Sequence, residues 1–317
     1  MVERTPSRSP LLSRYDAVRA RIVEASLRSG RRPSEVTLVA VSKSATPEQI
    51  VELACAGHRD FGENRVQLLA ERVAQLGQLV QPAGLGGELG AARERPTRSG
   101  PRPAETSQGL LFGPEAHSAS ESVGPAPDVA AASATLAETT APPPSSRRTE
   151  SAPFTAGVLS DARWHLIGPL QRNKVRKAIE LSSLIHSVEN LRQAEAIHEE
   201  AMSRDTVAEV LVQVNVAGEK AKHGMNARAV PAVVEQLETM AGLEVRGLMC
   251  MAPLVDDPES VRPIFEQCRE LFDELRRADG ARRRFDTLSM GMSNDFEVAI
   301  ECGATMLRVG SAIFAEA

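Results

Sequence analysis

The chain has 317 residues, a formal net charge of −5 at pH 7 and four cysteines, none of them in a CxxC pair. The slight acidic excess gives no reason to expect nucleic acid or an anionic membrane as a partner, and no apolar run could span a bilayer. Scattered cysteines exclude a metal-ligand spacing and indicate reduced thiols inside a cell. We therefore expect a cytoplasmic protein. An organelle address in residues 1–14, which contain several arginines and serines, is the alternative.

The first elements along the chain are a helix, a strand and a second helix. Apolar residues recur at helical spacing over residues 15–25. The apolar run 36–41 predicts a strand buried on both faces, as in parallel sheets, and Lys43 follows it. Thr46 and Pro47 have the pattern of a helix start. An ammonium group thus lies at the carboxyl end of an interior strand, where α/β enzymes have their active sites. The alternative is a lysine whose side chain merely extends from the core to solvent.

Residues 77–162 have a different character from the rest of the chain. Pro, Gly, Ser, Ala and Thr dominate there and apolar periodicity disappears, so the segment cannot bury enough surface to offset the entropy of ordering it. We predict a disordered insertion within one domain, formed by residues 1–76 and 163–317, because loop-closure entropy grows slowly with length. A linker between two domains is the alternative.

Further strands are predicted on both sides of this segment. They cover residues 59–64, 163–168, 184–188, 210–215, 243–251, 285–290 and 305–310. With the strand at 36–41 they make eight, alternating with helical patterns, which favours a single (β/α)8 barrel of the TIM type with an extra N-terminal helix. The carboxyl ends of such strands face one mouth. The side chains expected there include Lys43, Asn64, His165, Met251, Ser289 and Arg308.

Glycine-containing loops follow the last two strands, at residues 289–293 and 308–311. Glycine lets backbone N–H groups approach a phosphate, and these loops are the usual phosphate site of such barrels; a tight turn is the alternative for each glycine alone. A lysine facing a phosphate site suggests an imine with a carbonyl ligand, either a phosphorylated sugar or pyridoxal phosphate. Arg308 helps to choose, because an arginine at a pyridine nitrogen would keep that nitrogen unprotonated.

Six motifs together resemble the pyridoxal-phosphate homeostasis protein family, whose members are single-domain barrels similar to the N-terminal domain of alanine racemases. The motifs cover residues 39–43, 61–64, 164–174, 222–224, 288–293 and 308–314. The resemblance implies that Lys43 forms an aldimine with pyridoxal 5′-phosphate, and that the phosphate is held by Ser289, Gly310 and Ser311. It also implies that Arg308 contacts the pyridine nitrogen and that the ring pocket is lined by Asn64 and Met290.

The resemblance implies a carrier that acts in intracellular vitamin B6 homeostasis without robust catalysis. We expect a monomer or weak dimer, with pyridoxal-phosphate-dependent apoenzymes as candidate partners. The alternative is an amino-acid racemase of the alanine racemase type, which needs a second acid–base group on the opposite face of the cofactor. The only tyrosine, Tyr15, lies in the first predicted helix, which favours the carrier.

Overall fold

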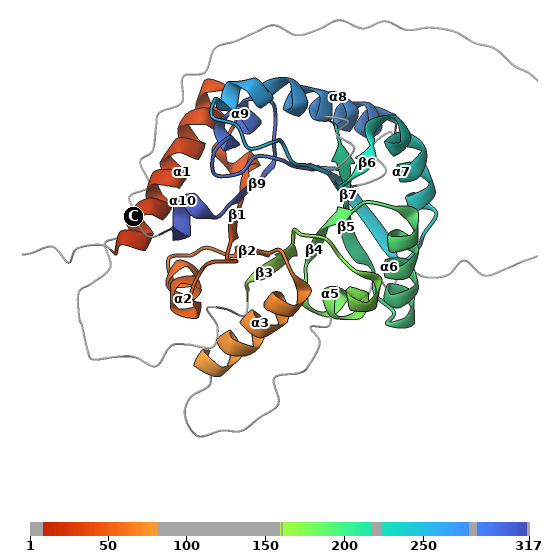
Figure 1. Ribbon diagram of the computed structural model, residues 1–317, viewed down its shortest axis with the longest axis horizontal. Coiled ribbons are helices and arrows are strands. Elements are labelled where there is room, and N and C mark those ends of the chain that lie inside the picture. The colour runs from red at the N-terminus through yellow and green to blue at the C-terminus, as the bar shows by residue number, and fades with distance from the viewer. Residues whose placement is uncertain (1–8, 81–158, 160, 217–222, 279–283, 316–317) are drawn as a thin grey trace, which may run out of the picture. The chain divides into compact units, whose positions relative to one another are not determined.

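The structure is a computed structural model that describes residues 9–80, 159, 161–216, 223–278 and 284–315. Within these ranges the strands form one parallel sheet whose two sides meet, because β4 pairs with both β3 and β5. All strands except the short β6 close into an eight-stranded barrel (Figure 1). The strands are β1 (Thr37–Val41), β2 (Asp60–Glu63), β3 (Arg163–Leu166), β4 (Leu184–Val188), β5 (Ala208–Asn215), β6 (Met225–Asn226), β7 (Leu243–Cys250), β8 (Thr287–Ser289) and β9 (Met306–Val309). The predicted (β/α)8 barrel of the TIM type is confirmed.

Helices surround this barrel, as Figure 1 shows. The α-helices are α1 (Pro10–Arg28), α2 (Pro47–Cys55), α3 (Val66–Val80), α5 (Val175–Leu181), α6 (Leu191–Ser203), α7 (Val230–Glu238), α8 (Arg262–Ala278), α9 (Phe296–Glu301) and α10 (Ser311–Phe314). Short 3-10 helices are η1 (Pro33–Glu35), η2 (Arg172–Lys174), η3 (Ala227–Ala229) and η4 (Pro258–Val261). Among the described residues, no helix has both the length and the apolar character needed to cross a membrane.

The start of α2 shows how local sequence fixes the connection after β1. The Thr46 hydroxyl accepts a hydrogen bond from the backbone N–H of Gln49, and the Gln49 side chain accepts one from the backbone N–H of Thr46. This capping box satisfies two of the N–H groups that a helix start leaves open, and Pro47 suits the first helical position. The chain between β1 and α2 is therefore a short turn of fixed shape, and this turn carries Lys43.

Apolar side chains fill the barrel in two layers. Inside the ring, a cluster built from strand residues alone unites five strands: Val39, Leu184, Leu211, Met249 and Met306. A larger cluster lies between the strands and the helices and includes fully buried residues such as Phe61, Phe265 and Phe296. Burial on this scale is the main source of stability in a barrel of this kind.

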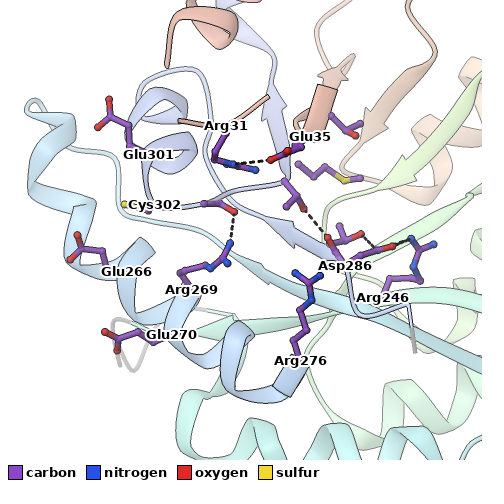
Figure 2. Close-up of a pocket in the computed structure, with 15 residues that line it drawn as sticks. Arg31, Glu35, Arg246, Glu266, Arg269, Glu270, Arg276, Asp286, Glu301 and Cys302 are labelled. Carbon is purple, nitrogen blue, oxygen red and sulfur yellow. Dashed lines mark hydrogen bonds and ion pairs between the residues drawn. The ribbon is translucent and has the colours of Figure 1, made fainter. Parts of the chain in front are cut away.

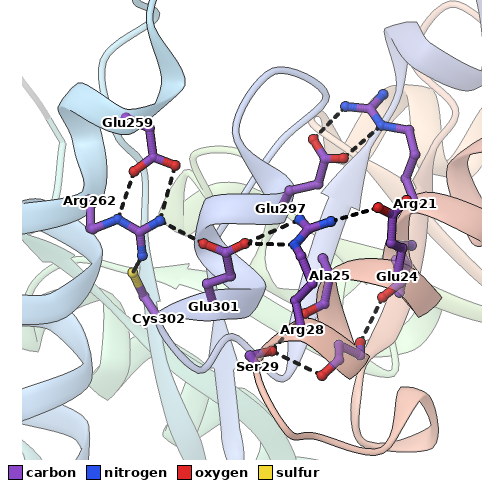
Figure 3. A network of polar contacts seen from close by, with 12 residues as sticks. Arg21, Glu24, Ala25, Arg28, Ser29, Glu259, Arg262, Glu297, Glu301 and Cys302 are labelled. Atoms are coloured by element: carbon purple, nitrogen blue, oxygen red, sulfur yellow. Dashed lines mark hydrogen bonds and ion pairs between the residues drawn. The ribbon is translucent and has the colours of Figure 1, made fainter.

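The extra N-terminal helix α1 packs along the side of the barrel next to α9 and α10 (Figure 1). Its buried residues are Leu11, Tyr15, Val18, Ile22, Ala25 and Ser26. At the rim of this contact, Arg21 pairs with Glu297 at 2.6 Å, and Glu301 joins Arg28 of α1 to Arg262 of α8 (Figure 3). Partly exposed ion pairs add little stability, so the apolar stripe holds α1 in place and the pairs fix its register.

The predicted insertion lies almost entirely outside the described residues. At its start, α3 continues to Val80, past the predicted boundary at residue 76, because apolar residues at helical spacing follow in the sequence at Leu79 and Val80. The division of the chain into one barrel domain and a disordered segment stays a prediction.

Candidate functional site

The carboxyl ends of the strands bring most of the predicted site residues to one mouth of the barrel. Lys43 follows β1 and is exposed, Asn64 follows β2 and is half-buried, and Met251 follows β7 with 42% of its surface exposed. Gly310 follows β9 and is buried, while Ser311 beside it is exposed. Because β8, β9 and β1 are neighbours in the sheet, the lysine and the two glycine loops lie on adjacent strand ends.

The turn that carries Lys43, residues 42–45, is held from beneath by two buried charged groups. The Ser42 hydroxyl donates to Glu63 Oε1 at 2.7 Å, and the Arg72 guanidinium donates to the carbonyl oxygen of Ala45. Arg72 Nε lies 3.7 Å from Glu63 Oε1, and Glu63 is fully buried. Burial raises the pKa of the Glu63 carboxyl, although Ser42 and Arg72 oppose that shift. The turn is thus rigid while the lysine side chain stays accessible.

Arg308 lies inside the barrel below the mouth and is only 4% exposed. Its Nη1 donates to Ser289 Oγ at 2.6 Å and its Nη2 donates to the carbonyl oxygen of Cys250 at 2.8 Å. Burial lowers the pKa of this guanidinium. A guanidinium carries five N–H donors, so these two contacts leave donors for a ligand in the mouth.

The loop after β8 packs against the loop after β9 through a second serine. Ser293 Oγ accepts hydrogen bonds from the backbone N–H groups of Gly310 and Ala312, both at 3.3 Å. Gly310 has a steric reason to be glycine, because a Cβ there would lie 3.1 Å from the backbone oxygen of Val41. Gly291 has φ +93°, a conformation that favours glycine, and a Cβ would lie 2.6 Å from Ala299 Cβ. Backbone N–H groups and a hydroxyl therefore converge at this edge of the mouth.

Three predicted residues lie elsewhere than expected. The Ser289 hydroxyl is fully buried and is bound by Arg308 and His186. His165 lies deep in the barrel, with its ring between His186 and Asp60 at the amino end of β2, and not at the mouth. Met290 is fully buried in the cluster between strands and helices, because the residue after inward-facing Ser289 points outward. We therefore revise the site to omit His165 and Met290 and to place Ser293 at the loop edge.

Ser293 belongs to the glycine-containing loop 289–293 that the sequence singles out, but the predicted phosphate site includes Ser289 and not Ser293. Side chains alternate along a strand, and Ser289 is the last residue of β8, whereas Ser293 lies in the turn before α9. Of two serines four residues apart, the one beyond the strand end is free to face the neighbouring loop. The position of the strand end separates the two, whereas strand parity does not, because residues four apart along a strand face the same way.

The opposite end of the barrel has a cavity of about 1050 Å³, lined by the starts of strands and by α8 (Figure 2). Some of its charged groups are paired: Arg246 contacts Asp286, which also lines the cavity, at 2.8 Å, and Glu209 next to the cavity at 2.7 Å. Arg269 donates to the carbonyl oxygen of Gly303. In barrels of this kind the amino ends of the strands serve stability, and the pairing here agrees with that role.

Comparison with known proteins gives consistent results along the whole barrel. The model for the alanine racemase N-terminal domain matches residues 14–317. The chain is 42% identical over 156 residues to the pyridoxal phosphate homeostasis protein of Aquifex aeolicus, covering 49% of this chain and 68% of that one. It is 29% identical over 297 residues to the protein of the same name from Pseudomonas aeruginosa, covering 94% and 91%.

Solved structures show the same likeness. PipY of Synechococcus elongatus, solved with PLP bound, has a TM-score of 0.59 and 28% identity, and the match covers 93% of this chain and 100% of that one. Alanine racemase from Clostridium difficile has a TM-score of 0.55 and 11% identity, covering 97% and 56%. At that identity the second match concerns the fold alone.

Proposed function

Because the chain belongs to the pyridoxal phosphate homeostasis protein family, we propose that it binds pyridoxal 5′-phosphate at the carboxyl mouth of its barrel and acts in the homeostasis of that cofactor. One observation carries the proposal: three adjacent strand ends present the three kinds of group that this ligand needs. The end of β1 offers a primary amine, the loops after β8 and β9 offer backbone N–H groups and a hydroxyl, and β9 offers a guanidinium.

Each group of the ligand has a matching residue. The cofactor supplies an aldehyde that reacts with a primary amine, and the exposed Lys43 on its rigid turn offers that amine. The phosphate would lie at Gly310 and Ser311, with Ser293 in place of Ser289, because N–H groups and a hydroxyl converge there. Arg308 would point its remaining N–H donors at the pyridine nitrogen. Asn64 and Met251, at the strand ends on either side, would border the ring.

We further propose that the protein is a carrier without robust catalysis. Arg308 is held by a hydroxyl and a carbonyl, not by a carboxylate, and an arginine at the pyridine nitrogen leaves that nitrogen unprotonated and the ring a poor electron sink. Tyr15 offers no acid–base group to the mouth, because it is buried in α1 and its hydroxyl lies 3.1 Å from His58 Nδ1. A cytoplasmic location, a monomeric or weakly dimeric state and apoenzymes as recipients stay predictions.

Titration of the purified protein with pyridoxal 5′-phosphate tests the binding proposal, with pyridoxal as the matched ligand that lacks the phosphate. We expect a new visible absorbance band and a Kd for the phosphorylated ligand that is at least tenfold lower, since a phosphate held by several N–H groups contributes charge-assisted hydrogen bonds. Equal affinity for both ligands would contradict the phosphate assignment.

Incubation of the loaded protein with amino acids in deuterated water tests the carrier proposal. We expect no exchange of the α-proton above the rate of free pyridoxal phosphate. Rapid exchange that depends on Lys43 would favour the racemase alternative instead.

A further inference from the structure

A continuous series of buried polar side chains crosses the barrel interior from the amino end of β2 to Arg308. His165 Nε2 lies 3.1 Å from Asp60 Oδ1, and His165 Nδ1 lies 3.0 Å from His186 Nε2. His186 Nδ1 lies 3.1 Å from Ser289 Oγ, which Arg308 contacts at 2.6 Å. The five residues come from β2, β3, β4, β8 and β9, so the series spans the ring rather than one side of it.

The chemistry of the two ends gives the series a direction. Arg308 can only donate, so Ser289 Oγ accepts from it, whereas an ionised Asp60 can only accept, so His165 Nε2 must donate. The direction also requires a neutral His165, whose Nδ1 accepts from the Nε2–H of His186. His186 is left with an acceptor at Nδ1, which takes the Ser289 hydroxyl proton. In all four hydrogen bonds the donor therefore lies on the Arg308 side and the acceptor on the Asp60 side, and each hydrogen shared within the series has one acceptor.

The surroundings support two of the charge states that this direction needs, an ionised Asp60 and a neutral His186. Burial alone would raise the pKa of Asp60, but hydrogen bonds from His165 and Arg163 outweigh it and lower the pKa to about 2. Arg163 Nε donates to the same oxygen at 2.6 Å. Complete burial, together with repulsion from the Arg308 guanidinium, holds the pKa of His186 well below its usual range. Asp60 is thus a fixed anion and His186 a neutral ring.

We propose that Asp60, His165 and His186 are positioning residues for the cofactor site: they orient the Ser289 hydroxyl as an acceptor for Arg308 and so fix which N–H groups of Arg308 face the mouth. In the opposite tautomer, His186 would donate to Ser289 Oγ, and the displaced hydroxyl proton would have to find another acceptor inside the barrel. This role rests on the proposed function, because it assigns Arg308 to the ligand. It explains why two histidines lie beneath a site that they do not touch.

Nitrogen-15 NMR of the histidine rings in the protein without cofactor tests the direction itself. At pH 7, both His165 and His186, assigned with the single variants His165→Gln and His186→Gln, should show a protonated Nε2 and an unprotonated Nδ1. A protonated Nδ1 on His186 would overturn the proposal whatever the protein binds. Failure of the wild type to bind pyridoxal 5′-phosphate would instead overturn the proposed function, so the two results are separable.

The variant Asp60→Ala tests whether the far end acts on the site, and Glu209→Ala is the matched control. Both remove an arginine-paired carboxylate from the amino end of a strand, but Glu209 pairs with Arg246, outside the series. Asp60→Ala should mix the histidine tautomers and raise the Kd for pyridoxal 5′-phosphate about tenfold, the usual effect of one buried hydrogen bond. Glu209→Ala should change neither, and Asp60→Asn, which keeps an acceptor oxygen, should restore both towards wild type.

Equal losses of affinity in Asp60→Ala and Glu209→Ala would overturn the proposal, as would unchanged tautomers in Asp60→Ala. If Asp60→Ala does not fold, Ser289→Ala provides the test from the other end of the series. That variant should retain both Nε2–H tautomers, because Asp60 still orders the rings, yet lose affinity about tenfold. Loss of the tautomer preference in Ser289→Ala would show that Asp60 does not set the direction.

Discussion

The two ends of the barrel treat charge in opposite ways. At the amino ends of the strands, guanidinium groups and carboxylates pair with each other, as Arg246 does with Glu209. Figure 2 shows Arg246 together with its second partner, Asp286. At the carboxyl mouth, Lys43 has no ion-pair partner within the described part of the chain, and Arg308 keeps N–H groups to spare. Paired charges hold a fold together, whereas donors without partners are available to a ligand. Apart from the proposed series that begins at Asp60, the fold thus separates stability from binding along the barrel axis.

Lys43→Ala is expected to abolish the covalent binding of the cofactor at the mouth without changing the stability of the barrel. The side chain is exposed, so the melting temperature should change by no more than about 2 °C, while the visible band of the bound cofactor disappears. Absorbance spectra and thermal unfolding measure the two effects. Lys177→Ala, at an exposed lysine of α5 that pairs with Glu180, is the control and should keep the band. A normal band in Lys43→Ala would contradict the site.

Acid should weaken the barrel through its amino end. His58, whose Nε2 donates to the carbonyl oxygen of Asp60, is buried, and this burial lowers its pKa to about 4 from the usual 6.5. The folded state binds this proton less readily than the unfolded chain, so stability is full above about pH 6.5 and falls as pH drops towards 4. The loss attributable to His58 is at most about 3 kcal/mol. Urea unfolding should show that the free energy of unfolding falls less between pH 7 and pH 4.5 in His58→Gln than in the wild type. An equal fall in both proteins would contradict the role of His58.

Arg246→Ala should destabilise the protein while leaving binding intact. It removes a guanidinium that is 11% exposed from a partly exposed network with two carboxylates, and the loss costs about 1–2 kcal/mol of unfolding free energy. Urea unfolding measures the cost, and cofactor titration should give the wild-type Kd. A raised Kd without loss of stability would instead place the binding site at the amino ends of the strands.

Ser293→Ala is expected to have the smallest effect. It removes one hydroxyl from the edge of the mouth and should raise the Kd for pyridoxal 5′-phosphate about fivefold, as for one hydrogen bond of about 1 kcal/mol. Titration with pyridoxal should show no such change, because that ligand lacks the phosphate. Ser203→Ala, at the end of α6, is the control. An equal effect on both ligands would contradict the phosphate contact.

The barrel itself could be predicted because its strands are strongly apolar and lie between clear helix signals. β1, with its lysine and capping box, is the best example. The two-residue β6 went unpredicted, since so short a strand has no periodicity to detect, and the end of α3 was placed too early. Boundaries depend on tertiary contacts that propensity does not encode.

For the site, sequence could place residues at strand ends but not decide which way each side chain faces. Lys43 and Gly310 follow their strands, so position alone was sufficient for them. His165 and Ser289 are strand residues whose side chains point into the barrel, where both contact His186 of β4. No local sequence pattern reveals such a contact between distant strands. Met290 points the opposite way, out of the barrel, because one step along a strand moves a side chain to the other face.

Chemical mapping of the bound cofactor tests the separation of binding from stability most directly. The protein is loaded with one equivalent of pyridoxal 5′-phosphate, reduced with borohydride to make the bond permanent, digested and analysed by mass spectrometry. We expect a single modified peptide that contains Lys43. Modification spread over exposed lysines such as Lys177, or located on any other single lysine, would contradict it.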